Sequence, residues 1–388
     1  MALEREELAG WLRLALTPGV GNSTARKLLT AFGLPARIFT QSIEALGQCV
    51  STKQALALQT EPAECTELLG TTWHWLQEDP TRRRVLTLGD AHYPSGLLNM
   101  EDPPLLLYGI GCPQVWASNT FSPDPSQCLA VVGSRNPTTQ GASNAQQFSV
   151  ALVQAGLTIV SGLALGVDGA AHEGALAGAS EGQIATIAIV GTGLDRVYPR
   201  QHRDLAHRIA RHGLLLSEYH LGTPPLSANF PKRNRIIAGL SRGTLVVEAA
   251  LQSGSLITAR LAVEQGKDVF AIPGSIHSTQ ARGCHALIKQ GAKLVESAQD
   301  ILEELNPGLA AHSRPAHATD SDECDAYNEE EPKDPIWAAL GFDPVSLDVL
   351  LARTGMETPA LQVRLMELEL EGRVSRLPGG LFQRQMLS

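Results

Sequence analysis

The strongest constraint on the fold is the segment 129–178, in which short apolar runs alternate with turns rich in glycine and serine. The first run, 129–132, holds two adjacent valines and ends directly at Gly133, which predicts a buried strand. The elements expected after it are a helix over about 141–154, a second strand over 157–161 and another helix from 168 onward. A strand–loop–helix order that repeats in this way predicts a parallel sheet with helices packed on it.

Both turns of this segment have the composition of a phosphate site. Each brings backbone N–H groups to the start of a helix, which favours an anion, and Arg135 adds a guanidinium that suits a phosphate. The candidate residues are Gly133, Ser134 and Arg135 in the first turn and Gly162 and Gly166 in the second. The spacing is not Gly-x-Gly-x-x-Gly, and the Walker lysine is missing, so neither nucleotide fingerprint applies. The alternative is that these glycines only make tight turns.

The same order continues through the middle of the chain. Further strands are expected at 184–190, 214–217, 244–247, 269–272 and 293–295, with helices such as 203–211 and 257–265 between them. Loops at the carboxyl ends of parallel strands gather at one edge of the sheet. This places Ser253, Gly254 and Ser255 with the two glycine-rich turns, and an edge with several such turns suits a polymer backbone better than one small ligand.

An aromatic residue beside cations marks a second candidate site. Phe230 precedes Lys232, Arg233, Asn234 and Arg235. Proteins that bind single strands combine a base stacked on an aromatic ring, worth about 1–3 kcal/mol, with charge along the backbone. The alternative is that Phe230 packs in the core and the cations form a solvated helix start.

The formal net charge of −9 argues at first against a nucleic-acid partner. The acidic residues crowd into one polar segment, 320–334, whereas the segment 196–242 is rich in arginine. Because local patches set phosphate contacts, the total charge does not exclude such a partner.

Other features of the composition predict a cytoplasmic protein without a metal or cofactor. The six cysteines are scattered, with neither a Cys-x-x-Cys pair nor a nearby histidine at zinc spacing, which favours reduced thiols. No apolar run approaches the roughly 18 residues that a membrane helix needs. The sequence begins MALEREELAGW, which lacks the basic and then apolar pattern of a signal peptide.

The two ends of the chain differ from its middle. Residues 1–80 are predicted to be helical, with a Gly19-Val20-Gly21 turn that is typical of a helix-hairpin-helix. Residues 306–335 are polar and acidic and predict a disordered linker. Residues 336–388 predict two helices followed by a hairpin, which is a winged helix, and its second helix carries acidic residues that favour contact with protein over duplex DNA.

Six motifs, in order, resemble the DprA/Smf family of bacterial DNA-processing proteins: VVGSRNPT, SGLALGVDGAAHEGAL, TIAIVGTGLDRVYP, LLSEYHLGTPP, NFPKRNRIIAGLS and SGSLITARLA. The resemblance implies a Rossmann-like sheet domain over 81–305, between a SAM- or helix-hairpin-helix-like domain and the winged helix. It also implies a homodimer that binds single-stranded DNA without sequence preference, protects it in natural transformation and loads RecA, with single-strand-binding protein as a further candidate partner.

The resemblance carries DNA-binding roles to Arg135, Phe230, Arg233 and Arg235. This chain departs from the family pattern at Leu165, where some relatives have a lysine. The dimer interface is expected at an apolar face near Leu287, Ile288 and Leu294.

The family is not known for catalysis, so we expect no enzyme. One alternative is an enzyme that cleaves a nucleotide at the same sheet edge, using Glu248 or Asp168 as its carboxylate. Asp168 lies four residues before His172, but an acid at a helix start is also favoured by the helix dipole. A third alternative is a duplex-binding regulator that acts through the winged helix.

Overall fold

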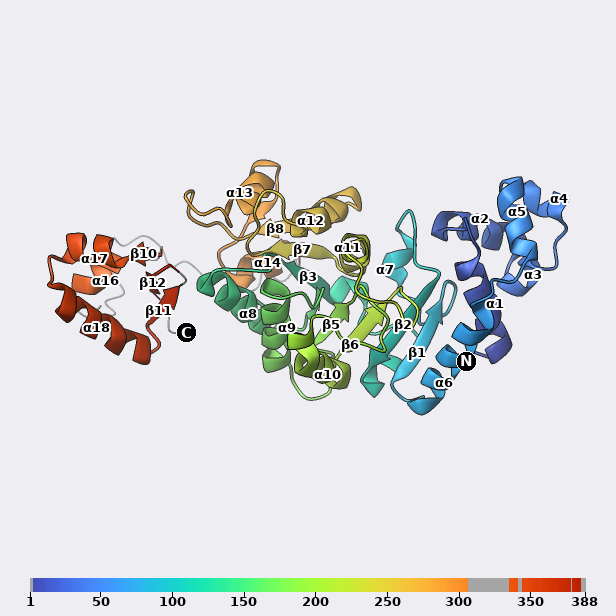
Figure 1. Cartoon of the computed structure of the whole chain (residues 1–388), viewed down its shortest axis with the longest axis horizontal. Helices are drawn as coiled ribbons and strands as arrows, with labels where there is room; N and C mark the ends of the chain where they lie inside the picture. Colours follow the sequence, from blue (N-terminus) through green and yellow to red (C-terminus); the bar gives the residue numbers. More distant parts are fainter. Residues whose placement is uncertain (1–2, 306–334, 341–343, 378, 385–388) are drawn as a thin grey trace, which may run out of the picture. The chain divides into compact units, whose positions relative to one another are not determined.

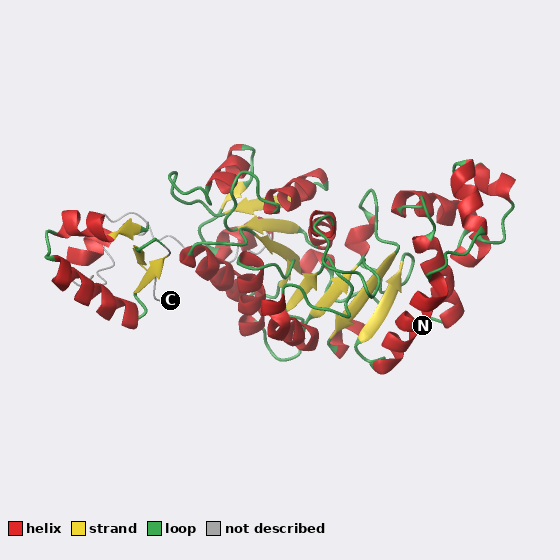
Figure 2. Ribbon diagram, viewed as in Figure 1, coloured by secondary structure: helices red, strands yellow, loops and turns green. Residues whose placement is uncertain are grey.

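The computed structural model describes residues 3–305, 335–340, 344–377 and 379–384 (Figures 1 and 2). The chain divides into two compact units, one within residues 1–305 and one within 306–388. The expected linker, 306–335, lies outside the described residues except for its last position. The four-part division into 1–80, 81–305, 306–335 and 336–388 stays a prediction.

The first unit begins with a group of helices. They are α1 (Arg5–Leu16), α2 (Asn22–Phe32), α3 (Pro35–Ile38), α4 (Ile43–Gly47), α5 (Thr52–Gln59) and α6 (Cys65–Glu78). Gly19 has a φ of 80°, which is the left-handed conformation that a tight turn between α1 and α2 requires. Trp75 of α6 contacts Tyr108 edge to face at 6.0 Å between ring centres, so these helices are joined to the sheet by a continuous core.

A nine-stranded sheet forms the centre of the first unit, in the order β1-β2-β6-β5-β4-β3-β7-β8-β9. The strands from β6 to β9 in this order run parallel to one another, whereas β2 is antiparallel to both of its neighbours, β1 and β6. The strands are β1 (Arg83–Thr87), β2 (Leu106–Gly111), β3 (Cys128–Val132), β4 (Thr158–Ser161), β5 (Thr186–Ile189), β6 (Leu214–Ser217), β7 (Gly243–Val246), β8 (Asp268–Ala271) and β9 (Lys293–Leu294). The parallel sheet that the alternating pattern predicts is confirmed.

Helices cover both faces of this sheet, because the central strands are apolar on both sides. Leu129 and Val131 pack on one layer, made by α8 (Thr139–Gln154), α9 (Val167–Gly178) and α14 (Ala298–Leu305). Helix α10 (Arg203–His212) packs beside α9. Ala130 and Val132 face the other layer, made by α7 (Ser95–Leu98), α11 (Asn229–Leu240), α12 (Ser255–Glu264) and α13 (Arg282–Lys289). Three short 3₁₀ turns, η1 (Pro113–Trp116), η2 (Pro125–Gln127) and η3 (Arg200–His202), lie in the connecting loops.

The strand order reverses between β3 and β7. From β3 the chain builds outward through β4, β5 and β6, then returns along α11 to place β7 on the other side of β3. The loops that leave β3 and β7 therefore diverge at the carboxyl edge, and this is where open α/β sheets bind ligands.

The second unit is a small helical domain with a three-stranded sheet in the order β10-β12-β11. It consists of α16 (Pro335–Leu340), β10 (Val345–Ser346), α17 (Leu347–Thr354), α18 (Thr358–Leu370), β11 (Val374–Leu377) and β12 (Leu381–Arg384). Gly355 ends α17 in the left-handed conformation, with a φ of 64°. The two helices and the hairpin confirm the predicted winged helix, and β10 is a strand that the sequence pattern did not predict.

None of the helices in the described part of the chain combines the length and the apolar character that crossing a membrane requires.

Candidate nucleic-acid interface

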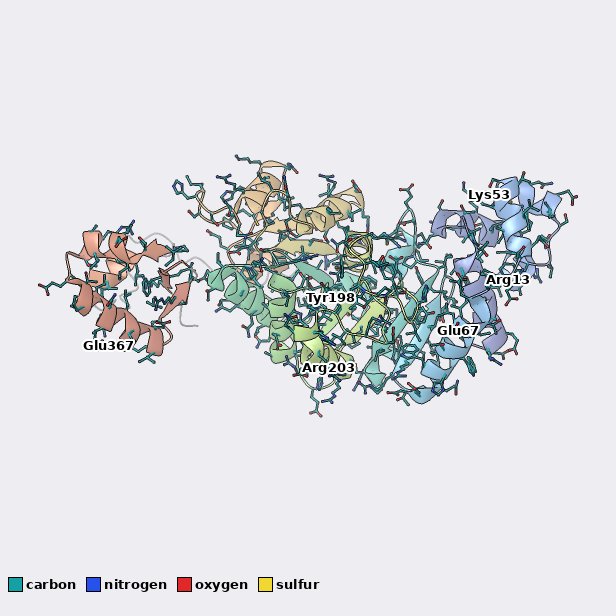
Figure 3. The ribbon with its side chains drawn as sticks, viewed as in Figure 1. Arg13, Lys53, Glu67, Tyr198, Arg203 and Glu367 are labelled. Carbon is teal, nitrogen blue, oxygen red and sulfur yellow. The ribbon has the colours of Figure 1, made fainter. Side chains whose placement is uncertain are left out.

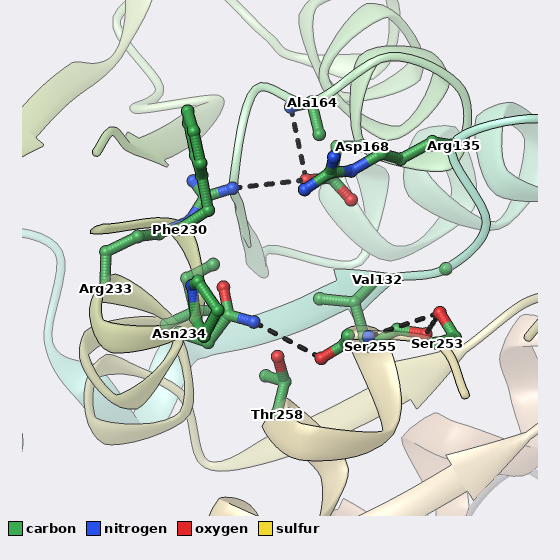
Figure 4. Close-up of a pocket in the computed structure, with 14 residues that line it drawn as sticks. Val132, Arg135, Ala164, Asp168, Phe230, Arg233, Asn234, Ser253, Ser255 and Thr258 are labelled. Carbon is green, nitrogen blue, oxygen red and sulfur yellow. Dashed lines mark hydrogen bonds and ion pairs between the residues drawn. The ribbon is translucent and has the colours of Figure 1, made fainter. Parts of the chain in front are cut away.

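A pocket of about 240 Å³ lies at the carboxyl edge, where β3 and β7 diverge (Figure 4). The loops after β3, β4 and β7 and the first turns of α11 and α12 surround it. Of the candidate residues, it brings together Gly133, Arg135, Phe230, Arg233, Asn234, Ser253, Gly254 and Ser255. Ser134, Gly162, Gly166, Lys232 and Arg235 do not line this pocket.

Arg135 and Phe230 form an open platform on one side of the pocket. The Arg135 guanidinium carbon lies 5.9 Å from the centre of the Phe230 ring, within the range of a cation–π contact. Arg135 is exposed, and no carboxylate pairs with it among the described residues. Phe230 is half-buried, so part of its ring stays accessible for stacking, and it is not the core residue of the alternative interpretation.

Tyr198 extends this platform and is a residue that the sequence analysis missed. Its ring lies 5.4 Å from that of Phe230, tilted by 36°, and the residue is 47% exposed (Figure 3). The contact joins the loop after β5 to the start of α11. An exposed aromatic within a family motif, TIAIVGTGLDRVYP, was the signal that could have found it.

Arg233 lines the base of the pocket with a buried side chain that serves the fold. Its guanidinium donates to the backbone carbonyls of Gly162 and Ile189 and lies 4.0 Å from Asp168 Oδ2. Burial lowers the pKa of Arg233 to about 10, which leaves it protonated at neutral pH. Burial raises the pKa of Asp168, while Arg233 opposes that rise. The arginine therefore ties together the ends of β4 and β5 at the base of the pocket.

The structure corrects the expectation that Arg235 lines a surface track. Its side chain is 9% exposed, pairs with Glu218 and donates to the backbone oxygen of Asp102 at 2.7 Å. Lys232 is exposed, but it lines a separate hollow of about 170 Å³ together with Glu218 and residues of α1. The cations after Phe230 therefore point to different places, and neither Lys232 nor Arg235 reaches the pocket.

The start of α12 closes the other side of the pocket. The hydroxyls of Ser253 and Ser255 are 2.7 Å apart, and Ser253 accepts from the backbone N–H of Ser255 at 3.3 Å. Asn234 donates to the carbonyl of Gly254 at 3.3 Å, which joins α11 to this turn. Two hydroxyls and a helix start offer hydrogen-bond partners to a phosphate without an added cation.

Two of the glycines have steric reasons for being present. A side chain at Gly162 would lie 2.1 Å from the Arg233 guanidinium. Gly166 has a φ of 81°, and a side chain there would lie 2.4 Å from the carbonyl of Ser134. The close approach of Arg233 accounts for Gly162, and the left-handed turn accounts for Gly166, so neither glycine needs a ligand to explain it.

The two carboxylates that a nucleotide-cleaving enzyme would need are bonded to the fold. Glu248 accepts from the backbone N–H of Thr138 at 2.9 Å and from its hydroxyl at 2.6 Å, at the start of α8. Asp168 accepts from the backbone N–H groups of Gly162 and Ala164 (Figure 4). His172 bonds Thr186 at 2.7 Å, and burial lowers the pKa of His172 to about 3, so it is neutral. Glu248 and His172 do not line the pocket, and Asp168, which does, is bonded to the backbone and paired with Arg233.

In the described residues, histidine, cysteine and acidic side chains form no group of three that could hold a metal ion. The described cysteines are free thiols.

Comparison with known proteins places the chain in a family. The family model described as DNA recombination-mediator protein A matches residues 84–306, which is more than half of the chain. The chain belongs to the DprA/Smf family. A second model, the DprA winged helix domain, matches residues 314–380. The resemblance to this family that the six motifs indicate is thereby confirmed.

Three relatives illustrate the family's range. Protein Smf of Escherichia coli is 41% identical, over 79% of this chain and 78% of its own length. The X-ray structure of DprA from Streptococcus pneumoniae matches with a TM-score of 0.62 at 36% identity, covering 78% of this chain and 99% of that one. A DprA structure from Helicobacter pylori, described as showing a single-stranded DNA binding mode, has a TM-score of 0.49 at 29% identity and covers 57% of this chain and 96% of that one.

Proposed function

We propose that this protein binds single-stranded DNA at the pocket between β3 and β7, without sequence preference, and presents it to RecA in DNA processing during natural transformation. Membership of a family described as recombination mediators supports a nucleic-acid role. The observation that carries the proposal for this site is the open platform of Arg135, Phe230 and Tyr198.

The chemistry of the platform fits a single strand and not a duplex. Phe230 and Tyr198 offer ring faces to bases that are free of a stacked partner, and every base has such a face. Arg135 offers a guanidinium to the adjoining phosphate, and Ser253 and Ser255 offer hydroxyls from the opposite wall. Contacts of these kinds do not distinguish bases, so sequence preference is not expected.

Exposed arginines continue the path beyond Tyr198. Arg200 lies two residues after it, and Arg203 begins α10 (Figure 3). We propose that the strand leaves the pocket over Tyr198 toward these residues, which would add phosphate contacts. Arg233 and Arg235 act on this path only through the fold, and Lys232 lies at a separate hollow outside it.

Fluorescence anisotropy of a labelled oligo-dT, repeated across a salt series, tests the proposal. Phe230→Ala should weaken binding roughly 5- to 150-fold, the equivalent of about 1–3 kcal/mol of stacking. Arg135→Ala should weaken binding and lower the slope of log affinity against log salt by about 0.7, the value for one phosphate contact on a single strand.

A matched control is Arg37→Ala, which removes an exposed arginine from α3, outside the sheet edge. It should leave both affinity and salt slope unchanged. If oligo-dT binds equally well to all variants, the site is wrong. The nucleotide-cleaving alternative would then be tested by turnover of nucleoside monophosphates, with Glu248→Gln as control.

Loading of RecA is the finer part of the proposal. The wild type should shorten the lag before RecA hydrolyses ATP on single-stranded DNA coated with single-strand-binding protein, and the Arg135→Ala, Phe230→Ala double variant should not. The proposal includes cytoplasmic action as a homodimer, with no catalytic step. The proposed interface is the apolar face of Leu287, Ile288 and Leu294, the last of which is 45% exposed on β9. Sedimentation velocity of Leu294→Lys tests that interface.

A further inference from the structure

Helix α18 of the winged helix has two apolar faces. Leu361, Leu365 and Leu368 are buried and pack in the core of the second unit. Val363, Met366 and Leu370 are 61%, 65% and 84% exposed. At about 100° per residue, the two sets lie on opposite sides of the helix. A helix at the surface normally has one apolar face, so the outer face of α18, defined by Val363, Met366 and Leu370, lacks a partner within the described part of the unit.

The spacing of the outer face is that of a helix–helix seam. Steps of three and then four residues, from 363 to 366 to 370, are the a and d positions of a heptad. Glu367 and Glu369 then occupy the two flanks of the seam. Figure 3 shows Glu367 at the outside of the unit. Arg364 lies 2.7 Å from Glu367, and Arg373 lies 3.6 Å from Glu371, so the cations near the outer face are paired with its acids.

Charge selects among the possible occupants. If the winged helix read a duplex, α18 would be the helix that follows the turn and enters the major groove, and the glutamates on both flanks would then meet phosphates. A second copy of α18 would place glutamates opposite glutamates along the seam, which destabilises such a pair. A helix with lysine or arginine at its flanks would meet the acids favourably.

We propose that the outer face of α18 binds a basic amphipathic helix of a partner protein, one with apolar residues at steps of three and four and with lysine or arginine on both flanks. The seam spans about 10 Å, or two turns, which suits a weak and reversible contact. This contact is independent of the pocket between β3 and β7. It gives the winged helix a role in recruiting protein while the sheet edge holds DNA.

The experiment uses the full chain and a labelled 21-residue peptide of three heptads, with leucine at positions a and d and lysine at e and g. A second peptide carries glutamate at e and g. Anisotropy should show binding of the lysine peptide that weakens with salt and is at least tenfold tighter than binding of the glutamate peptide. Met366→Lys should reduce binding of the lysine peptide at least tenfold. Because Met366 is exposed, this change should leave the melting temperature unchanged.

Two further variants sharpen the test. Leu56→Lys places the same charge at an exposed leucine of α5, which is 52% exposed, and should not affect peptide binding. Glu367→Gln with Glu369→Gln should weaken binding of the lysine peptide several-fold and flatten its salt dependence. If the lysine peptide binds the acidic segment 320–334 instead, Met366→Lys will leave its affinity unchanged, and that outcome would overturn the proposal.

The other occupants give distinct results. If Met366→Lys lowers the oligomeric state in sedimentation velocity, the outer face belongs to a second copy and the proposal is wrong. If Met366→Lys instead weakens binding of duplex DNA, the outer face reads DNA and the proposal is equally wrong. Failure of the lysine peptide to bind the wild type, or equal binding of both peptides, also contradicts it.

Discussion

Asp168 Oδ2 lies 4.0 Å from a guanidinium nitrogen of Arg233, and this buried ion pair forms part of the base of the pocket at the carboxyl edge of the sheet. The two side chains are 10% and 5% exposed. Together they hold the backbone at Gly162 and Ile189 in place. The DNA-binding surface proposed above therefore has an internal scaffold, and the two arginines of the site, Arg135 and Arg233, have separate roles.

The Arg233→Ala variant should unfold at a markedly lower denaturant concentration than the wild type. Removing one partner of a buried ion pair leaves the other charge unpaired, at a cost of about 3–5 kcal/mol. Arg135→Ala, at an exposed position, should change the free energy of unfolding by no more than about 0.5 kcal/mol. Urea denaturation followed by circular dichroism measures both. Equal stability of the two variants would contradict the division of roles.

Two further variants separate the effect of the unpaired charge from the effect of the arginine's shape. Asp168→Asn in the Arg233→Ala background removes the orphaned carboxylate and should recover part of the lost stability. Arg233→Lys keeps the charge but loses the planar fork that reaches two carbonyls and the carboxylate, so it should remain destabilised.

Tyr198→Ala should weaken binding of a long oligo-dT by about 1–3 kcal/mol if a second base stacks there. Tyr198→Phe keeps the ring and should bind normally. The effect should shrink when the oligonucleotide is shortened until it covers only Phe230. A loss in Tyr198→Phe equal to that in Tyr198→Ala would assign the role to the hydroxyl and contradict stacking.

The order of strands and loops was predictable because it depends on local patterns. Each buried strand is an apolar run that ends at glycine or another turn residue, and a strand–loop–helix order admits few topologies. The winged helix was predictable for the same reason, since its helices and hairpin are short and continuous in sequence. Strand β10 (Val345–Ser346) runs directly into helix α17 at Leu347, so its two residues do not stand out from the helical pattern.

Whether each cation after Phe230 is exposed or buried could not be predicted from the local sequence. Arg233 and Arg235 are held by Asp168 and Glu218, which come from other elements of the chain. Periodicity gave a partial signal, because Arg233 lies four residues before the buried Ile237 on the same face of α11. The contact between Tyr198 and Phe230 depends on how two distant loops meet, and no local pattern encodes it.

His172 should give the stability of the protein a specific dependence on pH. Burial lowers the pKa of His172 to about 3, whereas an unfolded histidine has a pKa of about 6.5. The unfolded state therefore binds the extra proton between these values. The stabilisation is complete above pH 6.5 and is lost as the pH falls toward 3, at up to about 1.4 kcal/mol per pH unit.

His172→Asn removes this titration while keeping a donor for the Thr186 hydroxyl. Between pH 7 and pH 5, the wild type should lose about 2 kcal/mol of unfolding free energy relative to the variant. Measuring the difference between the two proteins cancels the contributions of Asp168 and Glu218, whose pKa values burial raises and which titrate in both. Parallel pH profiles would show that His172 has the same pKa in the folded and unfolded states and would contradict its burial as a neutral ring.

Leu165→Lys should strengthen binding of single-stranded DNA. Leu165 is 38% exposed in the loop after β4, next to Ala164, which lines the pocket. Among the described residues that line the pocket, Arg135 is the exposed cation, and a lysine at position 165 would add a second cation beside it. The salt slope for oligo-dT should steepen by about 0.7, because one more phosphate would be neutralised.

Two controls identify the source of any gain. Leu165→Gln removes the apolar side chain without adding charge and should leave the slope unchanged. Leu251→Lys adds the same charge at a residue that is 58% exposed but does not line this pocket, and it should steepen the slope less than Leu165→Lys. A strand bound along the pocket contacts a cation at position 165 but not one at position 251, so the two lysine variants should have different salt slopes. Equal slopes would mean that DNA binding depends only on the protein's total charge.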